Sequence, residues 1–446
     1  MTSRDENLSA ATKAAELDSA LTLPDSPMLG TSSALSKVLG KGRVRGPLAI
    51  LGPAFVASVA YVDPGNFATN FAAGAKFGYQ LVWVIVMANL MAVMVQYLTS
   101  KAGLVTGRSL PELCHERFGR KWNTMLWIQA EVVAMATDLA EFVGASLGLY
   151  LIFGIPLFPA GLITAVVAFG VLSLEQRGYR KFELAIIALL ALIGAGFIYT
   201  FFTVGGQDYG AMAKGLVPSL SGSGSLALAV GIIGATVMPH VVYLHSALQK
   251  NRIRPANKSE LLTLLKFNRI DVGIGLGIAG VVNLSMLCIA AALFHKSGLT
   301  GIHDLDQIHS NLSTLVGGGA ALAFGVALMA SGFSSSSVGT YAGQVVMAGF
   351  MGWNIPLVVR RSITMAPALL VLALGVNTTE ALVLSQIVLS FGIPFALLPL
   401  ILVTRDRAVM GEYVNTRLIS GTMWVIAAII SVLNFFLLYD AITGAF

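Results

Sequence analysis

The chain has 446 residues, of which 56% are hydrophobic and only 11% are charged, with a net charge of +6. A soluble domain carries about 25% charged residues, and a core of this size would still need a polar shell. The composition therefore excludes a soluble globular protein and predicts that most of the surface faces lipid.

Apolar segments of about 20 residues recur along the chain, as membrane-spanning helices require. The polar residues 1–46 precede them and are predicted to be a disordered tail without the features of a secretory signal peptide. We predict eleven spans, at residues 48–77, 80–100, 124–152, 157–174, 183–204, 225–249, 269–294, 320–349, 357–375, 380–403 and 418–443.

The basic residues predict the orientation of these spans. With the N-terminus in the cytoplasm, 25 of the 28 Lys and Arg residues fall on the cytoplasmic side, leaving Lys76, Lys214 and Lys296 outside. Cytoplasmic loops are enriched in basic residues, so we expect a cytoplasmic N-terminus and an extracytoplasmic C-terminus. The basic pI of about 9.3 then reflects membrane topology, and binding to nucleic acid is not expected.

The first span contains the run Asp63-Pro64-Gly65-Asn66. Proline removes a backbone donor and clashes with the preceding helical turn, and glycine adds backbone freedom. A carboxylate at the bilayer centre costs at least about 2.5–3.5 kcal/mol. We interpret the run as a functional break in the helix. The alternative is a proline kink whose carboxylate pairs with a basic side chain.

The sixth span contains a second proline at mid-span, in Ala235-Thr-Val-Met238-Pro-His240. The two breaks lie an odd number of spans apart, in the first and sixth, so spans 1–5 and 6–10 have opposite orientations. Paired interruptions in two inverted halves indicate the midplane binding site of a transporter. The predicted organisation is a first repeat at 47–204, a second at 205–404, and an added eleventh span within 405–446.

If the two breaks face each other, Asp63, Asn66 and Met238 converge with free carbonyl groups near Ala60 and Ala235. Oxygen ligands suit many divalent cations, whereas hard Mg²⁺ and Ca²⁺ do not favour the thioether of methionine. The set predicts a transition-metal site, although a single methionine within a helix is ordinarily core filler.

The third span carries three acidic residues, Glu131, Asp138 and Glu141, with Glu131 and Asp138 on nearly one face. Carboxylates inside a membrane must pair or titrate. Arg360 and Arg361, at the cytoplasmic start of span 9, are the expected partners. The functional interpretation is a proton path from the first break towards the cytoplasm, and the alternative is a structural salt-bridge network.

Three further sites carry polar side chains within the spans. His240 follows the second break and is suited either to relaying protons or to capping the broken backbone. Gln386, in span 10, is the best ligand candidate among the embedded amides. The small residues around Ser334–Ser337 in span 8 most simply permit close helix packing, but serines there keep a sodium-coupled transporter as an alternative.

These motifs resemble the Nramp divalent-metal transporters. The resemblance rests on Asp63–Asn66, Ala235–His240 and Gly339-Thr-Tyr-Ala-Gly-Gln344, and it covers essentially residues 47–443. It implies an all-α membrane protein with the 5+5 inverted-repeat, LeuT-like transporter fold. The metal ligands it implies are Asp63, Asn66, Met238 and the Ala235 carbonyl, with Gln386 joining in some states, and the positions linked to proton coupling are Asp63, His240, Asp138 and Glu141.

The expected function is import of Mn²⁺, and also of Fe²⁺, Co²⁺ and Cd²⁺, across the plasma membrane with protons by alternating access. The protein is expected to act as a monomer, not to be an enzyme and to need no cofactor beyond its cargo. The rivals are a sodium-coupled amino-acid symporter, whose substrate carboxylate Asp63 would repel, and a metal-sensing membrane protein, which would need an output domain.

Overall fold

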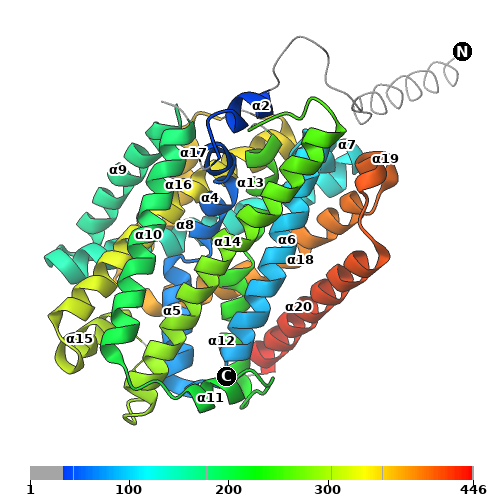
Figure 1. Cartoon of the computed structure of the whole chain (residues 1–446). Helices are drawn as coiled ribbons and strands as arrows, with labels where there is room; N and C mark the ends of the chain where they lie inside the picture. Colours follow the sequence, from blue (N-terminus) through cyan, green and yellow to red (C-terminus); the bar gives the residue numbers. More distant parts are fainter. Residues whose placement is uncertain are drawn as a thin grey trace, which may run out of the picture.

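The computed structural model describes residues 34–43, 45–176, 179–250, 252–302, 304–353 and 355–443. Within these ranges every regular element is a helix, and the long helices form one bundle (Figure 1). Short helices lie at its two ends, with α2, α7 and α19 at one end and α11 and α15 at the other. The helices are α2 (Ala34–Leu39), α3 (Arg45–Ile50), α4 (Pro53–Ala60), α5 (Pro64–Phe77), α6 (Val82–Thr106), α7 (Leu110–Arg117), α8 (Arg120–Phe153), α9 (Leu157–Gln176), α10 (Tyr179–Val204), α11 (Tyr209–Lys214), α12 (Ser223–Thr236), α13 (Pro239–Lys250), α14 (Lys258–Ala290) with a π-helical end η1 (Ala291–His295), α15 (Leu305–Leu315), α16 (Gly318–Met351), α17 (Leu357–Leu374), α18 (Thr378–Thr404), α19 (Arg407–Met410), a 3₁₀ turn η2 (Gly411–Tyr413) and α20 (Arg417–Thr443).

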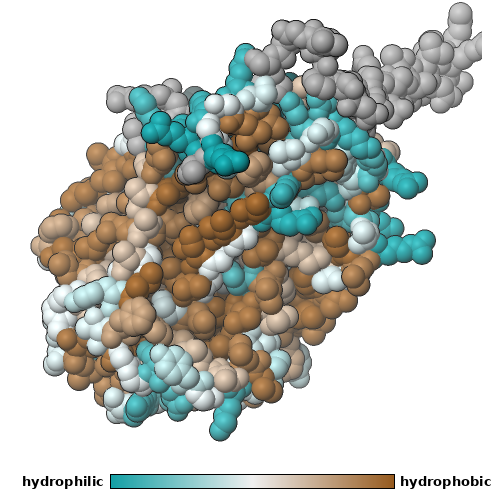
Figure 2. Space-filling model, viewed as in Figure 1, coloured by the Kyte–Doolittle hydropathy of each residue, from teal (hydrophilic) through white to brown (hydrophobic). Residues whose placement is uncertain are grey.

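The eleven predicted spans each correspond to one helix or to a helix pair. In the described part of the chain, eight helical segments are long and apolar enough to cross a bilayer by themselves. The other three spans are the split pair α4 and α5, the shorter α9, and α17. Figure 2 shows the matching surface, with hydrophobic residues around the middle of the bundle and hydrophilic ones gathered towards its ends.

The start of the seventh span differs most from the prediction. Helix α14 begins at Lys258, well before the predicted start at residue 269, because a polar N-terminal extension continues the same helix. The side chain of Asn257 caps this extension by accepting a hydrogen bond from the Glu260 N–H at 2.9 Å. A hydropathy pattern detects only the apolar part of such a helix, so its polar start was missed.

The predicted disorder of residues 1–46 is wrong for the part of the tail that the structure describes. Residues Ala34–Leu39 form α2, and Leu35 is buried against Ile50, Leu104 and Leu261. Leu35, Val38 and Leu39 pack in this cluster, so three apolar side chains on a short helix dock it on the bundle although the tail is polar in composition. Residues 1–33, where the rest of the predicted tail falls, lie outside the described residues.

The most enclosed helices are those of the second break. In the span formed by α12 and α13, 94% of an 18-residue apolar segment is buried inside the protein, compared with 28% of the corresponding segment in α20. Helix α20 therefore lies at the periphery, as expected for a span outside the two repeats, and it packs mainly on α18 and α12. The two broken spans lie at the centre, where the other helices shield their irregular backbone from lipid.

Helices α8 and α16 make the most extensive contact in the bundle, and glycines permit it. A Cβ atom on Gly332 would lie 2.7 Å from the Ala145 N, and one on Gly148 would lie 2.7 Å from the Met329 N. Ser334 and Ser335 of α16 bond within their own helix, and the hydroxyl of Ser335 donates to the Ser331 carbonyl at 2.8 Å. These contacts support close packing as the role of the small residues in span 8.

We expect Gly332→Leu to destabilise the protein strongly, because the new side chain would meet fixed backbone of α8. Overpacking of this kind typically costs about 1–3 kcal/mol. The matched control is Gly421→Leu in α20, where nothing lies within 4 Å of an added Cβ atom. Thermal unfolding in detergent should show a lower Tm for the Gly332 variant only, and equal Tm values for both would contradict this account of the packing.

Candidate metal site at the two chain breaks

Asp63 lies in the gap between α4 and α5 and caps the start of α5. Its Oδ1 accepts hydrogen bonds from the Asn66 backbone N–H at 2.8 Å and from Asn66 Nδ2 at 2.7 Å. Pro64 occupies the first helical position, where its missing N–H costs nothing. The predicted break exists, because α4 ends at Ala60 and α5 begins at Pro64. The Asp63 side chain is fully buried, so the break places a carboxylate inside the membrane-spanning bundle.

The second break lies between α12, which ends at Thr236, and α13, which begins at Pro239. Asn66 Nδ2 donates a hydrogen bond to the Ala235 carbonyl at 3.1 Å. This bond joins residues 169 positions apart in sequence, so the two breaks face each other as predicted. Met238 is fully buried between α12 and α13.

Gln386 of α18 completes this group. Its Nε2 is 3.4 Å from Asp63 Oδ2, and the side chain packs on Gly65, where an added Cβ atom would lie 1.9 Å from Gln386 Nε2. The Gln386 backbone also packs against Gly234 near the end of α12, where a Cβ atom would lie 2.1 Å from the Gln386 carbonyl oxygen. Glycines at both breaks thus allow α18 to approach the carboxylate.

Several buried oxygen atoms in this group have no hydrogen-bond partner. They include Asn66 Oδ1 and Gln386 Oε1. Leaving a buried polar atom unpaired costs about 1–3 kcal/mol, and such atoms beside a buried carboxylate are suited to coordinating a cation. Asp63, Asn66, Ala235 and Gln386 are in direct contact. Ala60 ends α4 at the first break, and Met238 lies in the second break between α12 and α13, so both remain predicted ligands.

Side chains from α14 and α16 hold the first break open. Asn283 Nδ2 donates to the Tyr61 carbonyl at 2.7 Å, and Ser331 Oγ donates to the Val62 carbonyl at 2.6 Å. Backbone carbonyls freed by a break must find partners within the protein, since lipid offers none. Asn283 therefore has the structural role expected of an embedded amide, and Ser331 is satisfied by the backbone at the break.

The three acidic residues of α8 and the two arginines of α17 meet as predicted, but they divide into two groups. Glu131 forms an ion pair with Arg360, with Oε2 and Nη2 2.7 Å apart. Arg361 is fully buried, donates to the Ser336 carbonyl at 3.0 Å and stacks on Phe142 with 5.3 Å between guanidinium and ring. Glu131 and Arg360 thus form a local salt bridge, whereas Arg361 is held by α16 and by aromatic rings.

Asp138 and Glu141 of α8 are buried near Arg361 and the candidate metal site. Both carboxyl groups interact electrostatically with Arg361, and Glu141 also does so with Asp63. Both carboxylate oxygens of Glu141 are buried without a hydrogen-bond partner within the described residues. A carboxyl group can bind and release a proton, whereas an arginine keeps its proton. Asp63, Glu141 and Asp138 are thus chemically able to hold and pass a proton, with Arg361 beside them as a fixed positive charge.

The two histidines of α13 have different surroundings. His240 Nδ1 lies 3.2 Å from Thr137 Oγ1 of α8, and its Nε2 has no hydrogen-bond partner. His245 Nδ1 lies 2.8 Å from Gln96 Oε1, and Gln96 Nε2 in turn donates to the Tyr61 hydroxyl at 2.5 Å. His245 therefore links α13 to the first break through α6, a connection that sequence reasoning did not identify.

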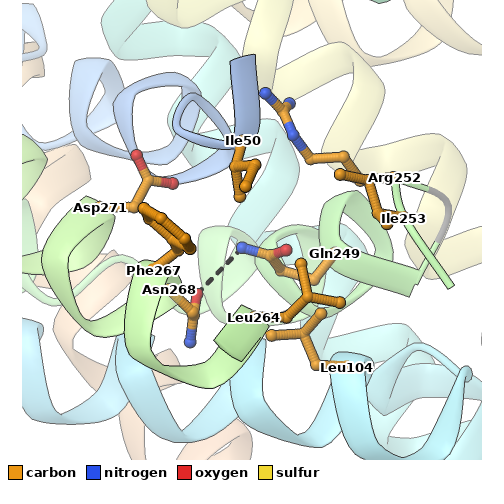
Figure 3. A pocket seen from close by; sticks show the side chains of 9 residues that line it. All are labelled: Ile50, Leu104, Gln249, Arg252, Ile253, Leu264, Phe267, Asn268 and Asp271. Atoms are coloured by element: carbon orange, nitrogen blue, oxygen red, sulfur yellow. Dashed lines mark hydrogen bonds between the residues drawn. The ribbon is translucent and has the colours of Figure 1, made fainter. Parts of the chain in front are cut away.

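A cluster of charges at the start of α4, largely buried except for Arg180, was also missed by the sequence analysis. We call it the α4 charge cluster, and it comprises Arg180, Glu183, Arg252 and Asp271. Glu183 Oε1 lies 2.7 Å from Arg252 Nη1 and its Oε2 lies 2.5 Å from Arg180 Nη1. Asp271 Oδ1 and Oδ2 accept hydrogen bonds at 2.9 Å from the N–H groups of Gly52 and Ala54. Figure 3 shows Arg252 and Asp271 on the wall of a small cavity beside Ile50.

Comparisons with known proteins agree with this arrangement. The Nramp family model, described as natural resistance-associated macrophage protein-like, matches residues 54–440. A protein of Deinococcus radiodurans named divalent metal cation transporter MntH is 50% identical over 405 residues, covering 91% of this chain and 93% of that protein. Its name is that of a transporter, which agrees with the prediction that the chain is not an enzyme.

Solved structures confirm the fold. The structure of a mutant manganese transporter of Eremococcus coleocola superposes with a TM-score of 0.79 at 31% identity, covering 94% of this chain and 89% of that one. The protein MhsT, solved in complex with L-phenylalanine, has a TM-score of 0.56 at 13% identity and shares the fold alone. The predicted LeuT-like 5+5 fold is therefore confirmed, and the chain belongs to the Nramp family.

Proposed function

We propose that this protein imports divalent transition-metal ions, Mn²⁺ foremost and also Fe²⁺, Co²⁺ and Cd²⁺, across the plasma membrane together with protons. The observation that carries the proposal is the contact of Asp63, Asn66, Ala235 and Gln386 across two facing chain breaks. The names of the relatives, divalent metal cation transporter and manganese transporter, support the same class of cargo.

The donor set suits a site that binds and then releases its cargo. Asp63, Asn66, Gln386 and the Ala235 carbonyl offer oxygen ligands, and Met238 offers a soft thioether that Mn²⁺ tolerates better than Mg²⁺ or Ca²⁺ does. No group of three or more His, Cys, Asp or Glu side chains suited to a metal occurs among the residues described. A tight structural site of the zinc type would need such a group.

Proton coupling is proposed to use the acidic face of α8. Asp63 gives up a proton when the metal binds, Glu141 and Asp138 accept it in turn, and Arg361 stabilises the carboxylates that remain ionised. Glu131, paired with Arg360, marks the cytoplasmic end of this path. An inside-negative membrane potential favours each inward positive charge by about 2.3 kcal/mol per 100 mV, so it drives both metal and protons inward.

The transport cycle is proposed to be alternating access around the two breaks. Asp63, Asn66 and Met238 are fully buried, an arrangement consistent with a state closed on both sides. We propose that the protein acts as a monomer with its N-terminus in the cytoplasm, where 25 of the 28 basic residues then lie. The repeats 47–204 and 205–404 would move against each other, with α20 outside them.

The experiment that tests this function is Mn²⁺ uptake into liposomes containing the purified protein, at two external pH values and with Ca²⁺ and Mg²⁺ as competitors. We expect saturable uptake with accompanying acidification of the lumen. Met238→Ala should keep uptake of Mn²⁺ but make Ca²⁺ an effective competitor, because the thioether no longer disfavours a hard cation. Absence of Mn²⁺ uptake by the folded wild type, with sodium-driven uptake of an organic solute, would overturn the proposal.

A further inference from the structure

A large apolar groove lies on the outside of the bundle, between α10 and α14, with α11 at one end. Its volume is about 630 Å³. The walls include Gly194 and Phe201 of α10 and Gly273, Gly277 and Val281 of α14. The two helices run along a face that is largely hydrophobic in Figure 2. The groove differs in chemistry from the two chain breaks, because no charged side chain lines it.

Glycines give the groove its depth, and they are not needed for close contact with a neighbouring helix. A Cβ atom on Gly273 or Gly277 would meet nothing within 4 Å, and one on Gly194 would meet only Val282 at 3.9 Å. By contrast, a Cβ atom on Gly332 would collide with the backbone of α8. Glycine inside a helix costs about 1 kcal/mol relative to alanine, and here no close protein contact offsets that cost.

The surroundings restrict what can fill the groove. Its rim carries exposed apolar side chains such as Ile198, Phe202 and Ile274, which are continuous with the lipid-facing surface of the two helices. The hydroxyl of Ser285, a polar group of the lining, already donates to the Val282 carbonyl at 2.6 Å. An uncharged, flexible hydrocarbon fits such walls, and the bilayer supplies acyl chains directly at this surface.

One end of the groove reaches the membrane interface at α11. Tyr209 and Met212 of this short helix line the groove, and Lys214 is exposed at its end. Tyrosine favours the boundary between hydrocarbon and water, and a lysine there can meet a phosphate. We propose that the groove between α10 and α14 binds one acyl chain of a bilayer phospholipid, whose headgroup lies beside α11.

The bound chain would pack on the segment of α14 that supports the first break. Val282 and Leu284 line the groove, and Asn283 between them donates its hydrogen bond to the Tyr61 carbonyl on the other side of the helix. The acyl chain is therefore part of the packing that keeps this helix against the chain break. This site is independent of the metal ligands and of the proposed proton path.

Photolabelling tests the proposal. The protein is reconstituted into nanodiscs containing a phosphatidylglycerol with a diazirine at the middle of one acyl chain, and labelled peptides are identified after irradiation. We expect label concentrated on residues 194–202 and 273–288, several-fold above the equally lipid-facing α20. Gly277→Phe, which fills the groove, should reduce that label several-fold, and Gly273→Leu should do the same.

The matched control is Gly421→Phe in α20, a helix position where an added side chain likewise meets open space. It should leave the groove label unchanged, and Mn²⁺ uptake verifies that each variant is folded. Label spread evenly over α10, α14 and α20, or unchanged in Gly277→Phe, would overturn the proposal. So would cross-links between two protein copies through Gly277→Cys, because they would assign the groove to a second chain.

Discussion

Asp63→Ala is expected to abolish Mn²⁺ uptake. Asp63 is the carboxylate of the proposed metal site, and its oxygens gather the Asn66 and Gln386 side chains around the gap between α4 and α5. Loss of even an indirect partner of a metal ligand costs about 10- to 100-fold in metal affinity, so loss of the charged ligand should cost at least as much. Uptake into liposomes and metal binding by calorimetry measure the two effects separately.

The same substitution also removes the N-cap of α5, which costs about 0.5–2 kcal/mol. Asp63→Asn is therefore the necessary control, because its amide oxygen can still accept the hydrogen bond from the Asn66 N–H. We expect this variant to retain a Tm near that of the wild type and still to lose both uptake and proton movement. Mn²⁺ uptake by Asp63→Asn at the wild-type rate would show that the carboxylate is not required.

The chain breaks could be predicted from sequence because their signals are local. The four residues Asp63–Asn66 contain a proline and a carboxylate and are flanked by apolar residues. Such a run disfavours an unbroken helix independently of the rest of the sequence. The partnership of the two breaks followed from counting spans, and the hydrogen bond from Asn66 to Ala235 confirms it. The ion pair of Glu131 with Arg360 was likewise foreseen from the embedded charges.

Contacts that depend on the exact packing of helices leave no local signal in the sequence. Arg360 and Arg361 are neighbours in sequence, yet one pairs with Glu131 and the other is enclosed by α16 and the ring of Phe142. Glu183 and Arg252 are near the ends of apolar spans, where charged residues ordinarily flank the membrane. Only the folded arrangement shows that they are buried and paired across 69 positions.

Arg252→Ala is expected to release the N-terminal end of the first broken span, at the start of α4. In the α4 charge cluster, Arg252 neutralises the fully buried Glu183 and also donates to the carbonyls of Ala49 and Leu51 at 3.0 and 2.7 Å. Removing the only partner of a buried ion pair costs about 3–5 kcal/mol, and the cost here is smaller because Arg180 still pairs with Glu183. That cost falls on the state in which α4 is docked, so the variant should favour states in which α4 has moved away.

Cysteine accessibility measures this shift. Ala57 of α4 is buried, so Ala57→Cys, in a background lacking Cys114 and Cys288, should react slowly with a maleimide in the otherwise unchanged protein. Adding Arg252→Ala should speed the reaction at least several-fold. Arg254→Ala, which removes a neighbouring exposed arginine, should not change it. Equal protection of Ala57→Cys in all three backgrounds would show that the cluster does not hold α4.

A substitution at Gly52 perturbs the same contact from the other side, and it should have the same effect. Gly52 has a φ of 147°, a conformation that disfavours any other residue, and an added Cβ atom would lie 1.3 Å from Glu183 Oε1. Gly52→Ala must therefore displace either α4 or the Glu183 carboxylate from Arg252. Accelerated labelling of Ala57→Cys by both Gly52→Ala and Arg252→Ala, without additivity in the double variant, would identify the docking of α4 as the shared step.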